Sequence, residues 1–364
     1  MKNNNFIKKI LTVAFLLTLT ACEQEEKKVT IKEPDKTITI IEDTDKEETE
    51  DVLSVWKIDR FEKLSITDWL DEETVIASKE NESLGKMSLA ELSGQYPISL
   101  YQFNINTKDY KRLKEQEEVI LGGASLSKDK KYLLYYEYSL GDPVFYIMNM
   151  DTLESYGLMG EPIGGAISAE WADNETIVGA AYSGGAYLAD RSGTINLVEE
   201  LKEEALYLVE KINDTIYFNT QYDGTLIKLD LNTKEKISLN LGQIFDMIPS
   251  PDGKQMLVLQ ANGAKSTLLV YDIESGETIV IGEGTEISGI SWSPDQRRIA
   301  YNLKENRNNT LVSGLYAYDL LTGNATQIAV DIDNPTTSWS PSGEKLAYTE
   351  YNGSKYNSSV IYLK

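Results

Sequence analysis

The chain has 364 residues, with 35 Lys and Arg against 58 Asp and Glu, and its net charge is −23. An acidic surface of this kind repels anionic lipid head groups and nucleic-acid phosphates, so we exclude nucleic-acid binding. The chain contains no histidine, which excludes a Ser-His-Asp or Cys-His catalytic apparatus and every His-ligated metal site.

Residues 1–21 have the organisation of an export signal. Lysines near the start supply positive charge, and residues 10–19 form an apolar core that is too short to span a membrane as a helix. The segment ends in the run LTAC, which resembles the lipoprotein box of bacterial lipoproteins. The resemblance implies attachment of long acyl chains such as palmitate to the sulfur of Cys22, with cleavage before this residue. The alternative is an ordinary secretory signal with an incidental cysteine.

Cys22 is the only cysteine of the chain. No disulfide can therefore form within one chain, and the folded domain must be stable through its core alone. Buried acyl chains contribute about 0.8 kcal/mol per methylene, so two of them anchor a protein durably. We expect a protein held by lipid on the extracytoplasmic side of the cell membrane.

Residues 22–51 are acidic and contain no aromatic residue. This composition predicts a flexible tether that is extended by charge repulsion. Within it, the run TITII at 37–41 is compatible with a strand that docks on the rim of the following domain, and this alternative stays open.

From residue 52 to residue 364 the sequence repeats a unit of about forty to forty-five residues. An apolar or aromatic residue ends one strand, a tight turn rich in Pro, Asp and Gly follows, and an apolar run begins the next strand. Pro presets the φ angle of such a turn, Asp295 or Ser342 can bond back to the backbone, and Gly253 and Gly343 tolerate positive φ. The clearest copies are WSPDQRRIAY at 292–301, WSPSGEKLAY at 339–348 and PSPDGKQMLVL at 249–259, and weaker copies begin at Leu126, Trp171, Trp69 and Glu210.

Two further strands follow each pair, and four strands per repeat indicate a β-propeller, an all-β fold of radially arranged blades. Anchors at 69, 126, 171, 210, 249, 292 and 339 predict seven blades, with six as the alternative because the copy near 210 is degenerate. Residues 334–364 supply only three strands. We therefore expect residues 54–61 to complete the last blade and close the ring, which hides exposed strand edges. The tryptophans at the anchors (Trp69, Trp171, Trp292 and Trp339) are expected in the core between blades.

The W-S-P-D-G-x-x-(I/L)-A-Y signature resembles the repeat of TolB-type propellers and of the propeller domains of prolyl-oligopeptidase relatives. The resemblance covers residues 52–364 and implies a propeller that works through protein contacts in the cell envelope. This chain departs from TolB-type proteins because it lacks a separate N-terminal α/β domain and carries a lipoprotein box. No G-x-S-x-G motif or hydrolase domain follows the repeats, so peptidase activity is not carried over.

Loops that follow the second strand of each repeat share one face of a propeller with the loops that enter each blade. Tyrosine, which offers a large amphipathic contact surface, recurs in these loops. We therefore expect a ligand or partner surface, although tyrosines that merely cap strand ends are the alternative. The candidate residues of this surface are Tyr138, Tyr182, Tyr222, Asn262, Arg307 and Tyr351.

The sequence thus predicts a lipid-anchored, non-catalytic binding or protein-assembly module of the cell envelope, without cofactor, metal site or catalytic residue. Its partners are the membrane, through Cys22, and an envelope protein, peptide or glycan. The alternative is a hydrolase of cell-wall glycans or oligopeptides that uses carboxylates or calcium.

Overall fold

The computed structural model describes residues 28–32, 37–41, 53–307 and 310–364, and it divides the chain into two compact units, Met1–Val52 and Leu53–Lys364. In the first unit, β1 (Lys28–Lys32) and β2 (Thr37–Ile41) pair antiparallel, with Val29 opposite Ile40. The predicted tether therefore contains a β-hairpin. Cys22, the predicted lipidation site, lies outside the described residues.

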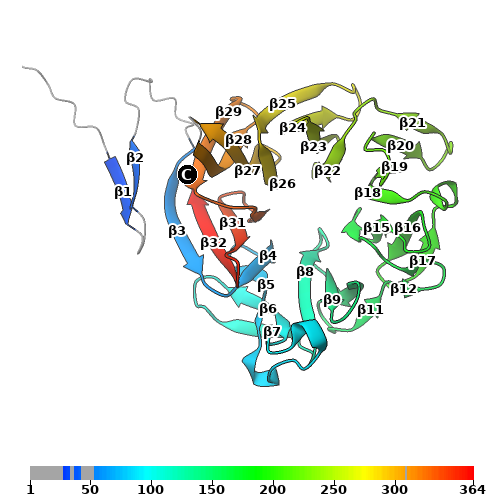
Figure 1. Ribbon diagram of the computed structural model, residues 1–364, viewed down its shortest axis with the longest axis horizontal. Helices are drawn as coiled ribbons and strands as arrows, with labels where there is room; N and C mark the ends of the chain where they lie inside the picture. The colour runs from blue at the N-terminus through cyan, green and yellow to red at the C-terminus, as the bar shows by residue number, and fades with distance from the viewer. Residues whose placement is uncertain (1–27, 33–36, 42–52, 308–309) are drawn as a thin grey trace, which may run out of the picture. The chain divides into compact units, whose positions relative to one another are not determined.

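The second unit is built from antiparallel strands arranged in four-stranded groups around a common axis (Figure 1). Its described residues contain no α-helix, only the 3-10 helices η1 (Glu82–Leu84), η2 (Ala90–Leu92) and η3 (Glu199–Leu201). The all-β class predicted from the repeat is therefore confirmed.

The first two groups form one eight-stranded sheet, which a single parallel pairing between Ile98 and Ile120 holds together. The first group contains β4 (Ser65–Trp69), β5 (Thr74–Glu80), β6 (Ile98–Asn104) and β7 (Tyr110–Lys114). The second contains β8 (Ile120–Leu126), β9 (Tyr132–Tyr138), β10 (Val144–Asn149) and β11 (Ser155–Gly157).

A short two-stranded pairing of β12 (Met159–Gly160) with β13 (Gly164–Gly165) precedes the third group. The third group contains β14 (Glu170–Trp171), β15 (Thr176–Ala180), β16 (Ala186–Asp190) and β17 (Ile195–Leu197). The degenerate copy near 210 also forms four strands: β18 (Leu206–Ile212), β19 (Thr215–Thr220), β20 (Ile227–Asp230) and β21 (Lys236–Ser238).

Two regular groups follow, and they contain the longest strands of the domain. One consists of β22 (Ile244–Pro249), β23 (Gln255–Asn262), β24 (Lys265–Asp272) and β25 (Thr278–Gly284). The other consists of β26 (Glu286–Trp292), β27 (Arg298–Arg307), β28 (Thr310–Asp319) and β29 (Asn324–Val330).

The last group joins both ends of the domain sequence. It contains β30 (Thr336–Trp339), β31 (Lys345–Tyr351), β32 (Tyr356–Leu363) and, as its outermost strand, β3 (Val55–Phe61). Strand β3 pairs antiparallel with β32, with Val55 opposite Leu363 and Phe61 opposite Ser358. The pairing that the sequence predicted for residues 54–61 is therefore present.

The core lies between neighbouring groups, because the second strands are apolar on both faces. Leu346 packs in one buried cluster with Ala300 and Leu315, whereas the next residue, Ala347, packs in a different cluster with Trp69. Successive side chains of one strand thus contribute to the interfaces on its two sides.

The turn after each innermost strand has the predicted chemistry. Gly253 and Gly343 have φ values of 70° and 72°, and Gln296 occupies the same place with φ 60°. The backbone N–H of Arg297 donates to Asp295 Oδ1 over 3.1 Å. The serine that precedes the turn also caps it, since Ser293 Oγ accepts from the N–H of Arg298 over 2.8 Å.

The anchor tryptophans occupy matching positions between groups. In three of the four, the indole Nε1 donates to the carbonyl oxygen one residue before the anchor of the preceding group: Trp171 to Ser125 (3.1 Å), Trp292 to Ile248 (3.1 Å) and Trp69 to Ser338 (3.0 Å). Their predicted place between neighbouring groups is confirmed. None of the helices in the part of the chain that the structure describes has the length and apolarity needed to cross a membrane.

Candidate functional site

The two ends of the strand groups differ in character. Because the strands are antiparallel, second strands end where the innermost strands begin, and we call this end the loop face. The opposite end carries the turns of the repeat, and we call it the turn face. The six candidate residues of the ligand or partner surface all lie at the loop-face end of second strands. Four are the last residues of their strands: Tyr138 of β9, Asn262 of β23, Arg307 of β27 and Tyr351 of β31. Tyr182 and Tyr222 follow β15 and β19.

Two of these residues make defined contacts with another part of the loop face. Tyr182 hydrogen-bonds through its hydroxyl to Asp142, in the loop that follows Tyr138, and burial together with this carboxylate raises the pKa of the Tyr182 hydroxyl. Tyr351 packs against Tyr356 with ring centroids 5.0 Å apart. Arg307, by contrast, pairs with Glu305 of its own strand. The structure thus connects Tyr182 to the loop that follows Tyr138, whereas no hydrogen bond or ion pair among the described residues joins the other candidates to these two.

Exposed tyrosines gather on the loop face beyond those that the sequence indicated. Tyr207 is the second residue of β18 and Tyr356 begins β32, and both are about half exposed, like Tyr182 and Tyr351, while Tyr222 is 89% exposed. We call Tyr182, Tyr207, Tyr222, Tyr351 and Tyr356 the tyrosine face. Tyr138 is half-buried and does not belong to it.

Other exposed large apolar side chains are spread over both faces and the outer strands. Leu140, Met159, Ile167 and Leu311 are exposed in loops or strand starts of the loop face. The turn face exposes Leu153 and Leu321, in the turns between third and fourth strands. Contiguous exposed apolar surface marks interaction sites more often than scattered residues do.

Three acidic residues border the axis on consecutive innermost strands: Glu170 on β14, Glu210 on β18 and Asp246 on β22. Glu170 is exposed, and Glu210 and Asp246 are partly exposed, whereas their neighbours Val209 and Met247 are buried in the core. We call these residues the axial carboxylates. They keep contact with solvent although protein surrounds them.

Their environment raises the pKa of each carboxyl. The protein packed around Glu170 displaces part of its water, and this effect, followed by the charge of Asp246, raises the pKa of Glu170 to about 7. The same loss of water, followed by the charges of Glu170 and Asp246, raises the pKa of Glu210 well above its usual range. Burial also raises the pKa of Asp246. A pair of carboxyls with pKa values moved toward neutrality can hold one proton between them near pH 7.

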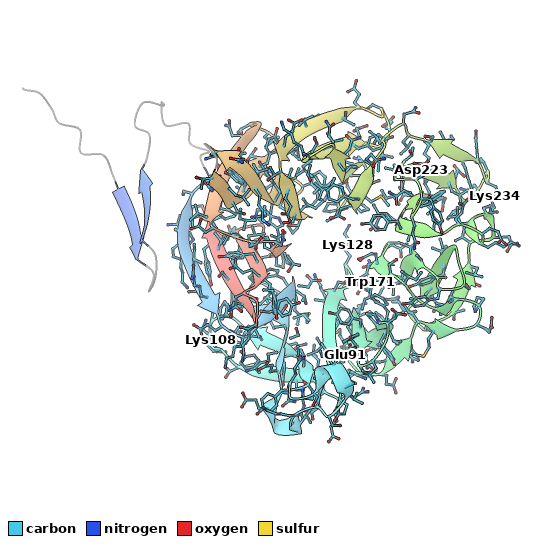
Figure 2. The ribbon with its side chains drawn as sticks, viewed as in Figure 1. Glu91, Lys108, Lys128, Trp171, Asp223 and Lys234 are labelled. Atoms are coloured by element: carbon cyan, nitrogen blue, oxygen red, sulfur yellow. The ribbon has the colours of Figure 1, made fainter. Side chains whose placement is uncertain are left out.

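A lysine lies near the axis on the turn face. Lys128, in the turn after β8, donates from Nζ to the carbonyl oxygen of Pro251, in the turn after β22, over 2.9 Å. Figure 2 shows Lys128 toward the centre of the ring of strands. The turn-face end of the axis therefore carries a positive charge and the carboxylates lie inward from it.

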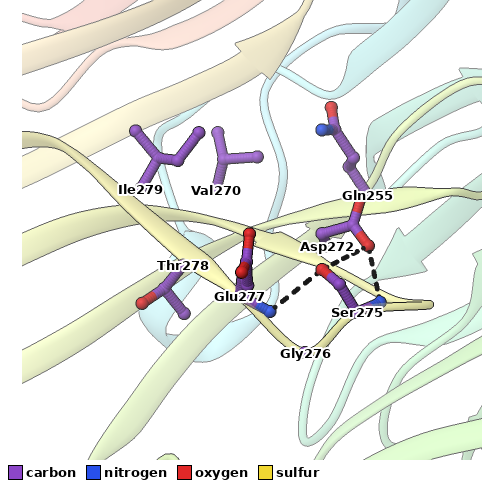
Figure 3. Close-up of a pocket in the computed structure, with 8 residues that line it drawn as sticks. All are labelled: Gln255, Val270, Asp272, Ser275, Gly276, Glu277, Thr278 and Ile279. Carbon is purple, nitrogen blue, oxygen red and sulfur yellow. Dashed lines mark hydrogen bonds between the residues drawn. The ribbon is translucent and has the colours of Figure 1, made fainter.

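A separate pocket of about 440 Å³ lies away from the axis, against the outer strand β25 (Figure 3). It is built on a turn in which Asp272 Oδ1 accepts from the N–H of Ser275 over 2.8 Å, and Ser275 Oγ accepts from the N–H of Glu277 over 3.2 Å. Ile279, one of its lining residues, is 53% exposed. The side chains of Asp272 and Ser275 are already bonded within the turn itself, so we assign the pocket no role.

Sequence reasoning missed Tyr207, Tyr356 and the axial carboxylates. A signal for the carboxylates was present, since Glu170 directly precedes the anchor Trp171, where better copies have Ser291 or Ser338, and Glu210 stands at the anchor position of its own copy. An acidic residue at a position that otherwise carries serine marks an unusual environment. In the described ranges, no group of three or more Cys, Asp or Glu residues could hold a metal ion.

No protein-family model matches the sequence, and no curated protein matches it. Solved structures do match. An oligogalacturonate lyase in complex with manganese is 14% identical with a TM-score of 0.58, covering 85% of this chain and 98% of that chain. The β-propeller domain of Cps50 (Swd1) from Myceliophteria thermophila is 11% identical with a TM-score of 0.56, covering 85% and 99%.

TolB from Acinetobacter baumannii also matches, at 14% identity and a TM-score of 0.48, over 79% of this chain and 63% of that chain. At these identities the likeness concerns the fold. The chain has a β-propeller fold, and the propeller that its TolB-like repeat predicted is confirmed.

Proposed function

We propose that this protein is a lipid-anchored, extracytoplasmic β-propeller that binds a partner protein through its loop face. The observation that carries the proposal is the concentration of exposed tyrosines on that face, above all Tyr222 at 89% exposure. Tyrosine buries a large area at low entropy cost and is enriched where binding energy concentrates. The structures it resembles include propellers of different activities, so the proposal rests on the site.

We propose further that the ring has seven blades, whose innermost strands are β4, β8, β14, β18, β22, β26 and β30. Strand β3 would close it by completing the last blade, as its pairing with β32 supports. Two contacts between the first and last groups support closure: the hydrogen bond from Trp69 to Ser338, and the bond of 2.9 Å from Thr349 Oγ1 to the carbonyl oxygen of Ile66.

Membrane attachment is proposed through acylation of Cys22, which the LTAC run supports. The test compares the wild type with Cys22→Ser by metabolic labelling with an alkyne-bearing fatty acid and by membrane fractionation. We expect the wild type to carry label and to sediment with membranes, and the variant to lose both. A labelled Cys22→Ser protein would contradict the proposed anchor.

The loop face is tested by site-specific photo-crosslinking in intact cells. A photoreactive amino acid replaces Tyr222 or Tyr351 on the loop face, or Ile279 on the outer edge as a control of comparable exposure. We expect one reproducible adduct, identified by mass spectrometry, from the loop-face positions alone. Equal adducts from position 279, or none from either loop-face position, would refute the proposal.

The axial carboxylates favour a second candidate, a hydrolase of wall glycans or oligopeptides. A carboxyl kept protonated near pH 7 beside an ionised one is the arrangement that general acid–base hydrolysis uses. The test is turnover of purified wall fragments by the wild type and by Glu210→Gln. Turnover that the variant abolishes would establish this candidate, and turnover by neither would leave binding as the function.

A further inference from the structure

We propose that the tyrosine face and the axial carboxylates form one docking surface for a basic segment of a partner protein, with a lysine or arginine side chain of that segment reaching the carboxylates. The inference rests on the proposed binding function and names the chemistry of the partner. Three features support it: the carboxylates form no ion pair, they adjoin the tyrosine face, and tyrosine rings lie in the same strand groups.

The axial carboxylates have no cation of their own. None of the ion pairs found among the described residues includes Glu170, Glu210 or Asp246. The lysine next in sequence to Glu210, Lys211, instead pairs with Asp173 at 3.8 Å. Carboxylates held together without a counter-ion repel one another, so an incoming cation gains the full attraction of the group.

The carboxylates adjoin the tyrosine face through Tyr207. Tyr207 lies three residues before Glu210 on the same strand, a rise of about 10 Å. Its hydroxyl donates to the carbonyl oxygen of Phe245, the neighbour of Asp246, over 3.5 Å. At the turn-face end, the ammonium group of Lys128, which bonds to the carbonyl oxygen of Pro251, repels an approaching cation.

The tyrosine face suits a basic chain. Tyr182, Tyr207 and Tyr222 come from the same groups as the carboxylates, and the ring faces of tyrosine attract ammonium and guanidinium groups. Asp142 and Asp223 lie in the loops beside Tyr182 and Tyr222. The net charge of −23 adds long-range attraction, so the whole surface complements a positively charged segment.

Binding of such a segment is coupled to proton release. Because the pKa of Glu170 is about 7 and that of Glu210 lies well above its usual range, part of these carboxyls is protonated at neutral pH. An adjacent cation favours the ionised form and expels the proton. The groups that face them are Asp246 on β22 and Tyr187 on β16, whose hydroxyl donates to the Ser168 carbonyl oxygen.

The experiment is calorimetric titration of the full-length protein in detergent with two synthetic peptides. One contains lysine and arginine flanked by glycine and serine, and the other has glutamine at the basic positions. Titrations at about pH 7 in two buffers of different ionisation enthalpy measure the protons released on binding. We expect the basic peptide to bind and to release protons, and the glutamine peptide not to bind.

Variants locate the site. Glu210→Gln with Asp246→Asn should weaken binding of the basic peptide at least about tenfold and abolish proton release. Glu274→Gln with Glu277→Gln removes the same charge from an exposed turn on the turn face and should change neither. Melting temperatures verify that both double variants are folded.

Each outcome decides the proposal. Equal weakening by the two double variants would mean unspecific attraction to an acidic protein, and binding without proton release would place the peptide elsewhere. Equally tight binding of spermine or of calcium would assign the carboxylates to a free cation and overturn the partner segment. If Tyr222 still yields its crosslinked partner while the basic peptide fails to bind, the binding function stands and this inference alone fails.

Discussion

The indole Nε1 of Trp69 donates a hydrogen bond of 3.0 Å to the carbonyl oxygen of Ser338, so that the first four-stranded group of the propeller is bonded to the last. Trp69 has no solvent-exposed surface. Trp339, the equivalent anchor of the last group, is also buried, but its Nε1 has no hydrogen-bond partner among the described residues. The two anchors therefore form a natural pair of test and control.

We predict that Trp69→Phe destabilises the protein more than Trp339→Phe. Both substitutions remove similar volume, but the first also leaves the Ser338 carbonyl oxygen without its donor, which costs about 1–2 kcal/mol. Urea denaturation followed by circular dichroism gives the two free energies of unfolding. Equal losses would mean that the hydrogen bond between first and last groups contributes nothing to stability.

A second set of polar links joins neighbouring groups within the core. Asn219, fully buried on β19, accepts from the N–H of Leu208 over 3.0 Å and donates to the Ile244 carbonyl oxygen over 2.7 Å. Asn302, at the same place on β27, donates to the Ile332 carbonyl oxygen over 3.1 Å. Each side-chain amide thus hydrogen-bonds to the segment that enters the next four-stranded group.

We predict that Asn219→Leu destabilises the protein by about 2–4 kcal/mol, although leucine is apolar and of similar size. The substitution leaves the N–H of Leu208 and the carbonyl oxygen of Ile244 without their hydrogen-bond partner. Asn262→Leu, at an exposed strand end, is the control and should stay within about 0.5 kcal/mol of the wild type. Thermal and urea unfolding measure both. A neutral Asn219→Leu would indicate that water satisfies the two backbone groups.

The local chemistry of the repeat could be predicted from sequence because its causes are local. The turn at Asp295 and Gly343, the apolar second strands and the anchor tryptophans depend on residues within one unit or its neighbour. Even the pairing of Val55 with Leu363 follows from counting strands, since the last repeat lacks one.

The site could be predicted only in part. The positions of Tyr182, Tyr222 and Tyr351 follow from the register of the repeat. The gathering of Glu170, Glu210 and Asp246 does not, because it depends on which innermost strands become neighbours around the axis and on how far water is excluded there. The tether's β1–β2 hairpin was visible only as the single run at 37–41.

We predict that deletion of residues 53–61 prevents stable folding. The deletion leaves β32 as an unprotected edge and uncovers Leu363 and Tyr362, which are buried. The expected loss is about 5 kcal/mol or more, comparable with the whole stability of many domains. Near-ultraviolet circular dichroism and size-exclusion chromatography measure it. Deletion of 23–51 is the control and should leave the melting temperature unchanged, since Leu53–Lys364 forms its own compact unit.

The axial carboxylates give the stability a pH dependence whose sign follows from their raised pKa values. The pKa of Glu170 is about 7 in the folded protein, and that of Glu210 is raised well above its usual range. In the unfolded chain, glutamate has a pKa of about 4.3. Between these values the folded protein binds more protons than the unfolded chain, so the free energy of unfolding falls as pH rises.

We therefore predict that Glu210→Gln is more stable than the wild type at about pH 8 and equally stable at about pH 4 and below, where the wild-type carboxyl is protonated in both the folded and the unfolded chain. The gain at the higher pH should be about 1 kcal/mol, less than the full shift implies because water reaches the group. Urea unfolding of both proteins across this range provides the measurement, with Glu274→Gln on an exposed turn as the charge-matched control. Parallel curves for Glu210→Gln and the wild type would show that Glu210 titrates as an ordinary surface carboxyl, and proton release on binding a cation would then be lost as well.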